Sequence, residues 1–200
     1  MLTTEIHRSL DSTLDALIND EQIVAIFQNH SEWGPRALGN RSIMFDPRHP
    51  NAKNIVNAVK KREHYRPFAC TVMLEHANDY FEMLQLPESP WMSFAIQCKP
   101  KALKDIPTLV HADNTCRIQT VTEEQNKNYY NLIKGFYERT GVPIIFNTSF
   151  NLGGEAICET IYDAIDTCNR SMINHLYVPD DQEIDIPYEC IRDKTEYIPD

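Results

Sequence analysis

The spacing of apolar residues along the chain predicts helices that alternate with strands. Apolar side chains recur every three or four residues, as on one face of a helix, near residues 10–18, 52–59, 76–83, 126–141 and 160–168. Short apolar or alternating runs predict strands at residues 23–27, 42–47, 69–74, 92–98, 115–121, 143–146 and 172–178. Such an alternation within 200 residues is typical of a single α/β domain.

Polar and special residues mark where these elements end. Thr3 and Thr4 precede the first helix and are its expected N-caps, while Thr160 begins the last helix in a pattern close to a capping box. Gly141 follows the long helix at the position where a left-handed residue commonly ends one. Two prolines predict that residues 99–109 form a connection without regular structure.

The charge of the chain limits what it can bind. It carries 19 Lys and Arg residues against 29 Asp and Glu residues, a formal net charge of −10, and much of the acidic excess lies in residues 180–200. We therefore expect a domain over residues 1–179 followed by an acidic tail, 180–200, that is loosely packed or docked on a partner. Sequence-independent binding to nucleic acid or to anionic membranes needs clustered Lys and Arg, which this composition disfavours.

The cysteines and histidines show no metal-binding pattern. Six cysteines lie mostly within apolar runs and form no CxxC pair, which is typical of buried thiols in a reducing compartment. Seven histidines are scattered without HxxxH or HExxH spacing, so we expect no metal ligands. The chain opens without a signal peptide, and no apolar run reaches membrane length; a cytoplasmic protein without a membrane partner is the expectation.

Four polar clusters interrupt the apolar pattern. They are SEWGPRALGNRS (31–42), KKREHYR (60–66), Arg117 within the alternating run TCRIQTV, and NTSFN (147–151) at the end of a buried strand. Glycines let backbone approach a ligand closely, and guanidinium groups suit phosphate or carboxylate oxygens. The first cluster therefore predicts an anion-binding loop between two strands.

Each cluster also has an ordinary structural interpretation. Arg36 and Arg41 could be surface residues of a turn, and the basic residues 60–66 could complement the dipole at the end of a helix. Arg117 could face solvent from an alternating strand, and the polar residues 147–151 could cap a strand end. The alternatives remain open at the level of each single cluster.

Taken together, the clusters resemble one known family. The segments SEWGPRALGNRSI, KKREHYRPF, HADNTCRIQTV, GVPIIFNTSFN and GGEAI, in this order, are similar to the C-terminal region of the O-carbamoyltransferases that modify antibiotics and nodulation factors. The resemblance covers roughly residues 22–178. It implies a YrdC-like α/β domain, with a twisted mixed sheet flanked by helices, that binds carbamoyl phosphate and ATP and forms a carbamoyl-adenylate.

The resemblance also implies roles for individual residues. Arg36, Lys60, Arg66 and Arg117 would surround the phosphates as the catalytic cations, with Arg41 and Arg62 as further substrate-binding cations. Asn147 and Ser149 would donate hydrogen bonds to phosphate or carbamoyl oxygens, with Asn151 as a further substrate-binding residue. Mg²⁺ would bridge ATP oxygens and need few protein ligands.

In this family a metal-bearing domain of actin-like ATPase fold precedes the region and transfers the carbamoyl group to an acceptor hydroxyl. The resemblance begins about twenty residues after Met1. We therefore expect that domain to be a separate chain, or to have been truncated or lost. The chain departs from the family pattern at Asn29-His30, where the pattern usually has Gly-Arg, and this departure removes a possible cation. Asn114 replaces a glycine before the strand 115–121, which we expect to be a backbone adjustment.

Two other classes of function remain. One is a nucleic-acid-binding module, because YrdC-like folds occur in RNA modification, although the net charge of −10 argues against it. The other is a non-catalytic subunit that has kept the fold and stabilises a partner, which the presence of all four polar clusters disfavours.

Overall fold

The computed structural model describes residues 4–179 together with residues 181, 184 and 186. The strands are β1 (Glu5–His7), β2 (Val24–Phe27), β3 (Arg41–Phe45), β4 (Ala69–Met73), β5 (Ala95–Gln97), β6 (Thr115–Val121), β7 (Ile144–Ser149) and β8 (His175–Tyr177). The helices are α1 (Leu10–Ile18), α2 (Ala52–Val59), α3 (Ala77–Tyr80), α4 (Pro100–Asp105), α5 (Lys127–Thr140) and α6 (Ile161–Asn169), with two 3₁₀ turns, η1 (Leu74–His76) and η2 (Pro107–Leu109).

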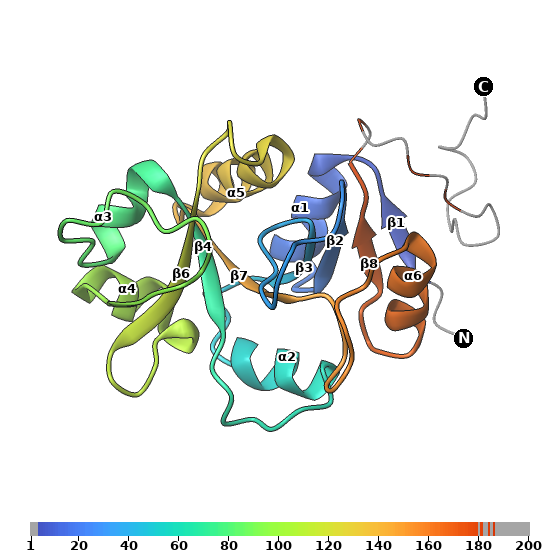
Figure 1. Cartoon of the computed structure of the whole chain (residues 1–200), viewed down its shortest axis with the longest axis horizontal. Coiled ribbons are helices and arrows are strands. Elements are labelled where there is room, and N and C mark those ends of the chain that lie inside the picture. The colour runs from blue at the N-terminus through green and yellow to red at the C-terminus, as the bar shows by residue number, and fades with distance from the viewer. Residues whose placement is uncertain (1–3, 180, 182–183, 185, 187–200) are drawn as a thin grey trace.

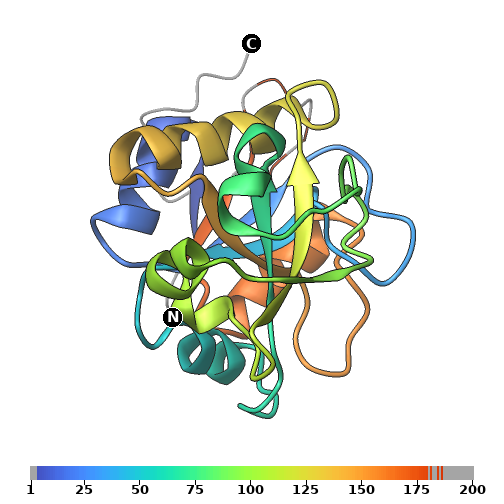
Figure 2. The same cartoon turned by 90° about the vertical axis from the view of Figure 1, so that its left-hand side faces the viewer.

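All the strands belong to one sheet, in the order β1-β8-β2-β3-β7-β4-β6-β5. The pairs β1–β8, β2–β8 and β4–β6 are parallel, and the other neighbouring strands are antiparallel. The sheet is therefore mixed, as expected. In Figure 1, α1 and α5 lie together at the top, α2 lies at the bottom, and α3 and α4 lie at the end near β6. Figure 2 shows β4 and β6 side by side from that end.

The helices form where the apolar spacing predicts them, and their ends explain the remaining differences. α5 begins after Asn126, whose side chain accepts from the Tyr129 N–H, and ends at Gly141 with a φ of 76°. α6 has the predicted capping box between Thr160 and Asp163. The expectation of Thr3 or Thr4 as N-cap of α1 is wrong, because Ser9 fills that position and accepts from the Asp11 N–H.

Two further expectations need correction. Residues 99–109 are not an irregular connection: α4 and η2 both start there with a proline in the first turn. Proline lacks an N–H, but a first-turn N–H has no helical acceptor, so proline is well tolerated at that position. Strand β1, which pairs with β8 at the edge of the sheet, was not predicted because three residues are too few to show a periodic pattern.

The two asparagines that replace family glycines adopt the left-handed conformation. Asn29 has a φ of 49° and Asn114 a φ of 61°. Asparagine tolerates this region better than most residues with a side chain. The left-handed backbone at Asn114 is one that glycine also adopts readily.

One continuous core lies beneath these elements, contributed by both faces of the sheet and by α1, α5 and α6. The five cysteines within the described residues are buried, as predicted, and Cys190 lies outside that part of the chain. The acidic tail also lies outside it, apart from residues 181, 184 and 186; of these, Ile186 is buried. Across the described residues, no helix is both long enough and apolar enough to cross a membrane.

Candidate functional site

The site is built on one row of residues that crosses the centre of the sheet. Ala69, the first residue of β4, lies directly opposite Arg117 of β6 on one side and Asn147 of β7 on the other. Directly paired residues of neighbouring strands point to the same face. A methyl group therefore stands between two long polar side chains, which leaves space above Ala69.

The loop 31–42 closes over this space because a buried carboxylate gathers its backbone. One oxygen of Glu32 accepts from the N–H groups of Leu38 and Asn40 at 2.7 Å each and of Arg41 at 3.2 Å. Gly39 lies against the ring of Tyr129 with a φ of 106°, and an added Cβ would come within 2.2 Å of that ring. The prediction of a loop between two strands is confirmed, since β2 precedes it and β3 begins at Arg41.

Three arginines from different elements meet in a pocket over this row, which we call the cation pocket. Arg36 comes from the loop 31–42, Arg62 follows α2, and Arg117 comes from β6. The pocket has a volume of about 80 Å³, and its other lining residues are Pro35, Ala37, Pro67, Phe68, Ala69, Met92, Asn147, Thr148 and Ser149. Its lining contains no carboxylate among the residues that the structure describes.

The arginines in the cation pocket, Arg36, Arg62 and Arg117, have no acidic side chain at ion-pair distance in the part of the chain that the structure describes. Burial, followed by repulsion from Arg36, lowers the pKa of Arg117. Burial also lowers the pKa of Arg62 to about 10, with repulsion from Arg66 and Arg117 as the next causes. An anion placed among these side chains would relieve that repulsion.

Two buried polar atoms in the lining of this pocket have no hydrogen-bond partner within the described structure. One is the Nε–H donor of Arg117, and the other is the acceptor Oδ1 of Asn147. The orientation of the Asn147 amide is fixed, because its Nδ2 donates to the carbonyl oxygen of Ala37 at 3.1 Å and to Thr71 Oγ1 at 2.9 Å. Unpaired buried donors and acceptors are costly, and a ligand that reaches this pair has to offer both an acceptor and a donor.

Lys60 lies beside the cation pocket and holds the end of β7. Its ammonium group donates to Ser149 Oγ at 3.2 Å, to Asn151 Oδ1 at 2.8 Å and to the carbonyl oxygen of Ser149. Burial, with repulsion from Arg62 as the next cause, lowers the Lys60 pKa to about 7. The structure thus brings Lys60, Ser149 and Asn151 together, and only Ser149 of the three lines the pocket.

The remaining predicted cations occupy different surroundings. Arg66 is exposed, ion-paired with Glu63 at 3.1 Å, and lines a neighbouring pocket of about 490 Å³ together with Arg62. Arg41 is buried above the ring of Phe27, with its guanidinium carbon 3.6 Å from the ring centroid. Its N–H groups donate to the carbonyl oxygens of residues 28, 29, 40 and 159, so this arginine ties the loop 31–42 to the chain around it.

The sequence reasoning missed the residues that hold the site in place. Thr71 accepts from Tyr129 and donates to Gln119 Oε1 at 2.8 Å, and Gln119 Nε2 donates to the carbonyl oxygen of Leu38 at 2.9 Å. This network anchors the loop to β4 and β6. The alternation of residues 115–121 placed Gln119 on the same face as Arg117, which was the available signal.

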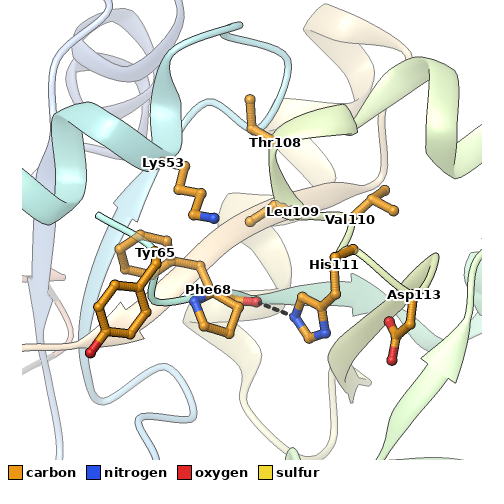
Figure 3. A pocket seen from close by; sticks show the side chains of 10 residues that line it. Lys53, Tyr65, Phe68, Thr108, Leu109, Val110, His111 and Asp113 are labelled. Carbon is orange, nitrogen blue, oxygen red and sulfur yellow. Dashed lines mark hydrogen bonds between the residues drawn. The ribbon is translucent and has the colours of Figure 1, made fainter. Parts of the chain in front are cut away.

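A larger pocket adjoins the cation pocket through Pro67 and Phe68, which line both. It has a volume of about 360 Å³ and is lined by Lys53, Tyr65 and residues 108–113 as well (Figure 3). His111 lines this pocket and makes two contacts. Its Nδ1 lies 3.1 Å from Thr115 Oγ1, and its Nε2 lies 3.2 Å from the Phe68 carbonyl oxygen. This contact fixes the backbone where β4 begins.

Comparison with known proteins identifies the family. Residues 15–182 match the family described as the carbamoyltransferase C-terminus. The chain is 45% identical over 166 residues to the nodulation protein NolNO of Sinorhizobium fredii, covering 80% of the chain and 24% of that protein. It is 42% identical over 182 residues to NolO of Bradyrhizobium diazoefficiens, covering 87% and 32%. The chain spans about a quarter to a third of the length of these relatives.

Solved structures share the fold. Full-length HypF, in a phosphate- and nucleotide-bound form, superposes with a TM-score of 0.58 at 20% identity over 88% of the chain and 25% of HypF. Sua5 of P. abyssi, complexed with L-threonine, gives 0.59 at 12% identity over 90% of the chain and 50% of Sua5. These likenesses confirm the expected YrdC-like fold. The match over residues 15–182 shows that the chain belongs to the carbamoyltransferase family and corresponds to its C-terminal region.

Proposed function

We propose that the cation pocket binds the phosphate and carbamoyl groups of carbamoyl phosphate together with the phosphates of ATP, and that this region forms a carbamoyl-adenylate. One observation supports the proposal most strongly: three arginines without acidic partners surround a small pocket that also contains an unpaired donor and an unpaired acceptor. Carbamoyl phosphate offers an acceptor for the arginine N–H groups and a donor for Asn147 Oδ1. Its phosphate accepts from guanidinium groups, and its –NH₂ donates.

The proposed reaction has two steps, hydrolysis of carbamoyl phosphate and then adenylation of carbamate. Water cleaves carbamoyl phosphate to carbamate and phosphate, and a carbamate oxygen then attacks the α-phosphorus of ATP. The bond between that phosphorus and the bridging oxygen to the β-phosphate breaks, and pyrophosphate leaves. The attacking oxygen is already anionic, so the second step needs no general base. Arginines directed at the phosphoryl oxygens stabilise the charge that develops there.

The residues have separate roles in this proposal. Arg36, Arg62 and Arg117 hold phosphate oxygens, and Asn147 Oδ1 accepts a hydrogen bond from the carbamoyl –NH₂. Its Nδ2 already donates to Ala37 and Thr71, so Asn147 acts as an acceptor and not as the donor first expected. Lys60 acts with Ser149 and Asn151 at the edge of the pocket, and Arg66 extends the positive surface toward the neighbouring pocket.

Mg²⁺ belongs to the nucleotide in this scheme. Within the described residues, the lining of the cation pocket offers arginine, amide and hydroxyl groups but no carboxylate, which suits an anion and not a bare cation. Mg²⁺ would therefore be held by ATP oxygens. Two adjoining pockets give room for the rest of ATP: the one of about 360 Å³ shares Pro67 and Phe68 with the cation pocket, and the one of about 490 Å³ shares Arg62.

Transfer of the carbamoyl group to an acceptor is proposed to need the part of a carbamoyltransferase that this chain does not span, a unit of actin-like ATPase fold. A carbamoyl-adenylate is labile in water, so activation is productive only where a second unit covers the site. Trp33 and Trp91 support a covering partner: they are 100% and 70% exposed and line one hollow beside the loop 31–42. Large exposed aromatic side chains in a group commonly mark an interface.

Calorimetry with two ligands tests the assignment. Arg117→Ala should weaken binding of both carbamoyl phosphate and inorganic phosphate by about 30-fold, on the order of 2 kcal/mol, because a charge-assisted hydrogen-bond partner is lost. Asn147→Ala should weaken carbamoyl phosphate more than phosphate, since only the former has an –NH₂ group to donate. The phosphate affinity of this variant also reports whether the pocket remains folded.

Arg139→Ala is the matched control. It also removes one positive charge, but Arg139 is paired with Asp11 and Asp15 on the surface between α5 and α1. Its affinity for both ligands should be unchanged. Equal losses in the Arg117 and Arg139 variants, or no loss in either, would remove Arg117 from the site.

A further inference from the structure

Three potential metal ligands meet at the opposite part of the sheet from the cation pocket. Glu5 and His7 of β1 and His175 of β8 place one carboxylate oxygen and two imidazole nitrogens all within 4.8 Å of one another. The cation pocket lies over the neighbouring strands β7, β4 and β6. β1 is the edge strand at the far side of the sheet, and β8 is its neighbour. Nothing in the proposed carbamoyl chemistry uses this group, which we call the edge triad.

The register of the two strands explains the convergence. Glu5 and His7 are two residues apart on one strand, so their side chains point to the same face. The parallel pairing sets His175 directly opposite Glu5. Spacing along the chain does not reveal the triad, because His7 and His175 are 168 residues apart. The expectation of no metal ligands came from that absence of local spacing.

The ring nitrogens of the two histidines lie close together. His7 Nε2 and His175 Nδ1 lie 2.8 Å apart, and the rings stack with centroids 5.0 Å apart. Two nitrogens bound to one tetrahedral zinc ion at about 2.0–2.1 Å would be about 3.3–3.4 Å apart, so the two rings must separate by about half an ångström to share an ion. His7 is buried, with 7% of its surface exposed, so its position is fixed by packing. The three donor atoms lie within 4.8 Å of one another, so shifts of the Glu5 and His175 side chains complete the set.

We propose that Glu5, His7 and His175 bind a divalent transition-metal ion, with zinc as the fitting representative, and that the ion fastens β1 to β8. Two imidazoles and one carboxylate form a donor set that suits zinc, and disfavours magnesium or calcium, which prefer oxygen ligands. β1 is an edge strand of three residues whose only strand partner in the described sheet is β8. An ion that bridges both strands adds a cross-link where the hydrogen-bonded ladder is shortest.

The test is a zinc titration of the full chain, freed of any polyhistidine tag and stripped with a chelator. Calorimetry should show one zinc ion bound per chain, and saturation should raise Tm by roughly 5 °C, because the ion binds the folded state more tightly than the unfolded chain. His175→Gln and Glu5→Gln should each weaken zinc binding at least tenfold and abolish the rise in Tm. His76→Gln, which alters a histidine paired with Asp79 on the surface, should change neither.

Two outcomes would overturn the proposal. If the chain binds no zinc, the contact between the two rings is a hydrogen bond between imidazoles only. If zinc binds equally to the His175 and Glu5 variants, its ligands lie elsewhere. Cobalt in place of zinc identifies that case, since binding to cysteine sulfur, such as that of Cys70 or Cys116, would give intense sulfur-to-metal absorption that imidazole ligands lack. The Glu5 variant keeps both histidines and thus tests the site even if His175→Gln fails to fold.

Discussion

The ammonium group of Lys60 is almost fully buried, and its position depends on three oxygens supplied by residues 149 and 151. Burial disfavours the charged form and lowers the pKa from its ordinary value of 10.5 to about 7. Near neutral pH this side chain therefore changes charge beside three permanently charged arginines. Its protonation is coupled both to folding and to the presence of an anion in the cation pocket.

The coupling to folding predicts a definite pH dependence. Between pH 7 and pH 10.5 the unfolded chain keeps the Lys60 proton and the folded chain does not, so the Lys60 contribution to the free energy of unfolding rises with pH. The difference in that free energy between the wild-type chain and Lys60→Met should increase by up to about 1.4 kcal/mol per pH unit above pH 7. Urea unfolding from pH 6 to pH 9 measures it.

In that experiment the subtraction cancels the groups common to both proteins. A difference that stays constant from pH 6 to pH 9 would show that the three oxygens keep Lys60 charged and that burial does not dominate.

At this scale, residue types were predictable and their partners were not. Arg36, Arg62 and Arg117 were selected from motifs, and the structure brings all three together. Arg41 comes from the same motif as Arg36, yet its guanidinium group binds backbone carbonyls. Both side chains are arginines near glycines, and only the tertiary fold decides which one turns inward.

Among elements, the pairing of β6, β4 and β7 creates the pocket. Ala69 stands between Arg117 and Asn147, so the size of this one side chain determines how much space remains. Glu32 then folds the loop 31–42 over the row through three backbone hydrogen bonds. Strand register and loop closure together account for the site.

The register predicts the effect of enlarging Ala69. Ala69→Leu should fill much of the cation pocket, of about 80 Å³, and weaken phosphate binding at least tenfold. Ala95→Leu is the matched control, because Ala95 of β5 lies directly opposite Arg117 on its other side and does not line the pocket. Calorimetry of both variants makes the comparison. Similar losses in both would show that the space above Ala69 is not where phosphate binds.

The loop makes a second prediction at this scale. Gly39 and Gly34 have nearly the same φ, 106° and 109°, but only Gly39 lies against another side chain. Gly34→Ala should cost about 1–3 kcal/mol of stability from backbone strain alone. Gly39→Ala should cost more, since its Cβ would collide with Tyr129. Urea unfolding compares them, and equal costs would contradict the packing described here.

Elements with strong periodicity were predictable, and short ones were not. α5 and β6 follow the apolar spacing closely. β1 has three residues and gains its stability from pairing with β8, which no local pattern can show. α4 was missed because its proline was taken as a break, whereas a proline in the first turn favours a helix start.

Over the whole molecule, the site combines segments that are distant in the chain, namely residues 31–42, 60–69, 117 and 147–149. The order of motifs identified the family, and the match over residues 15–182 confirms it. The network of Thr71, Gln119 and Tyr129 could not be predicted, since it depends on two strands and a helix meeting. The proposed edge triad has the same origin in tertiary structure.

The most direct test of the central claim is pyrophosphate release by the purified chain with ATP, Mg²⁺ and carbamoyl phosphate. The account predicts release that requires both substrates, falls at least 30-fold in Arg117→Ala and is unchanged in Arg139→Ala. It predicts no carbamoylated acceptor until the remaining part of a carbamoyltransferase is added. Pyrophosphate release that does not depend on carbamoyl phosphate, or that persists fully in Arg117→Ala, would contradict it.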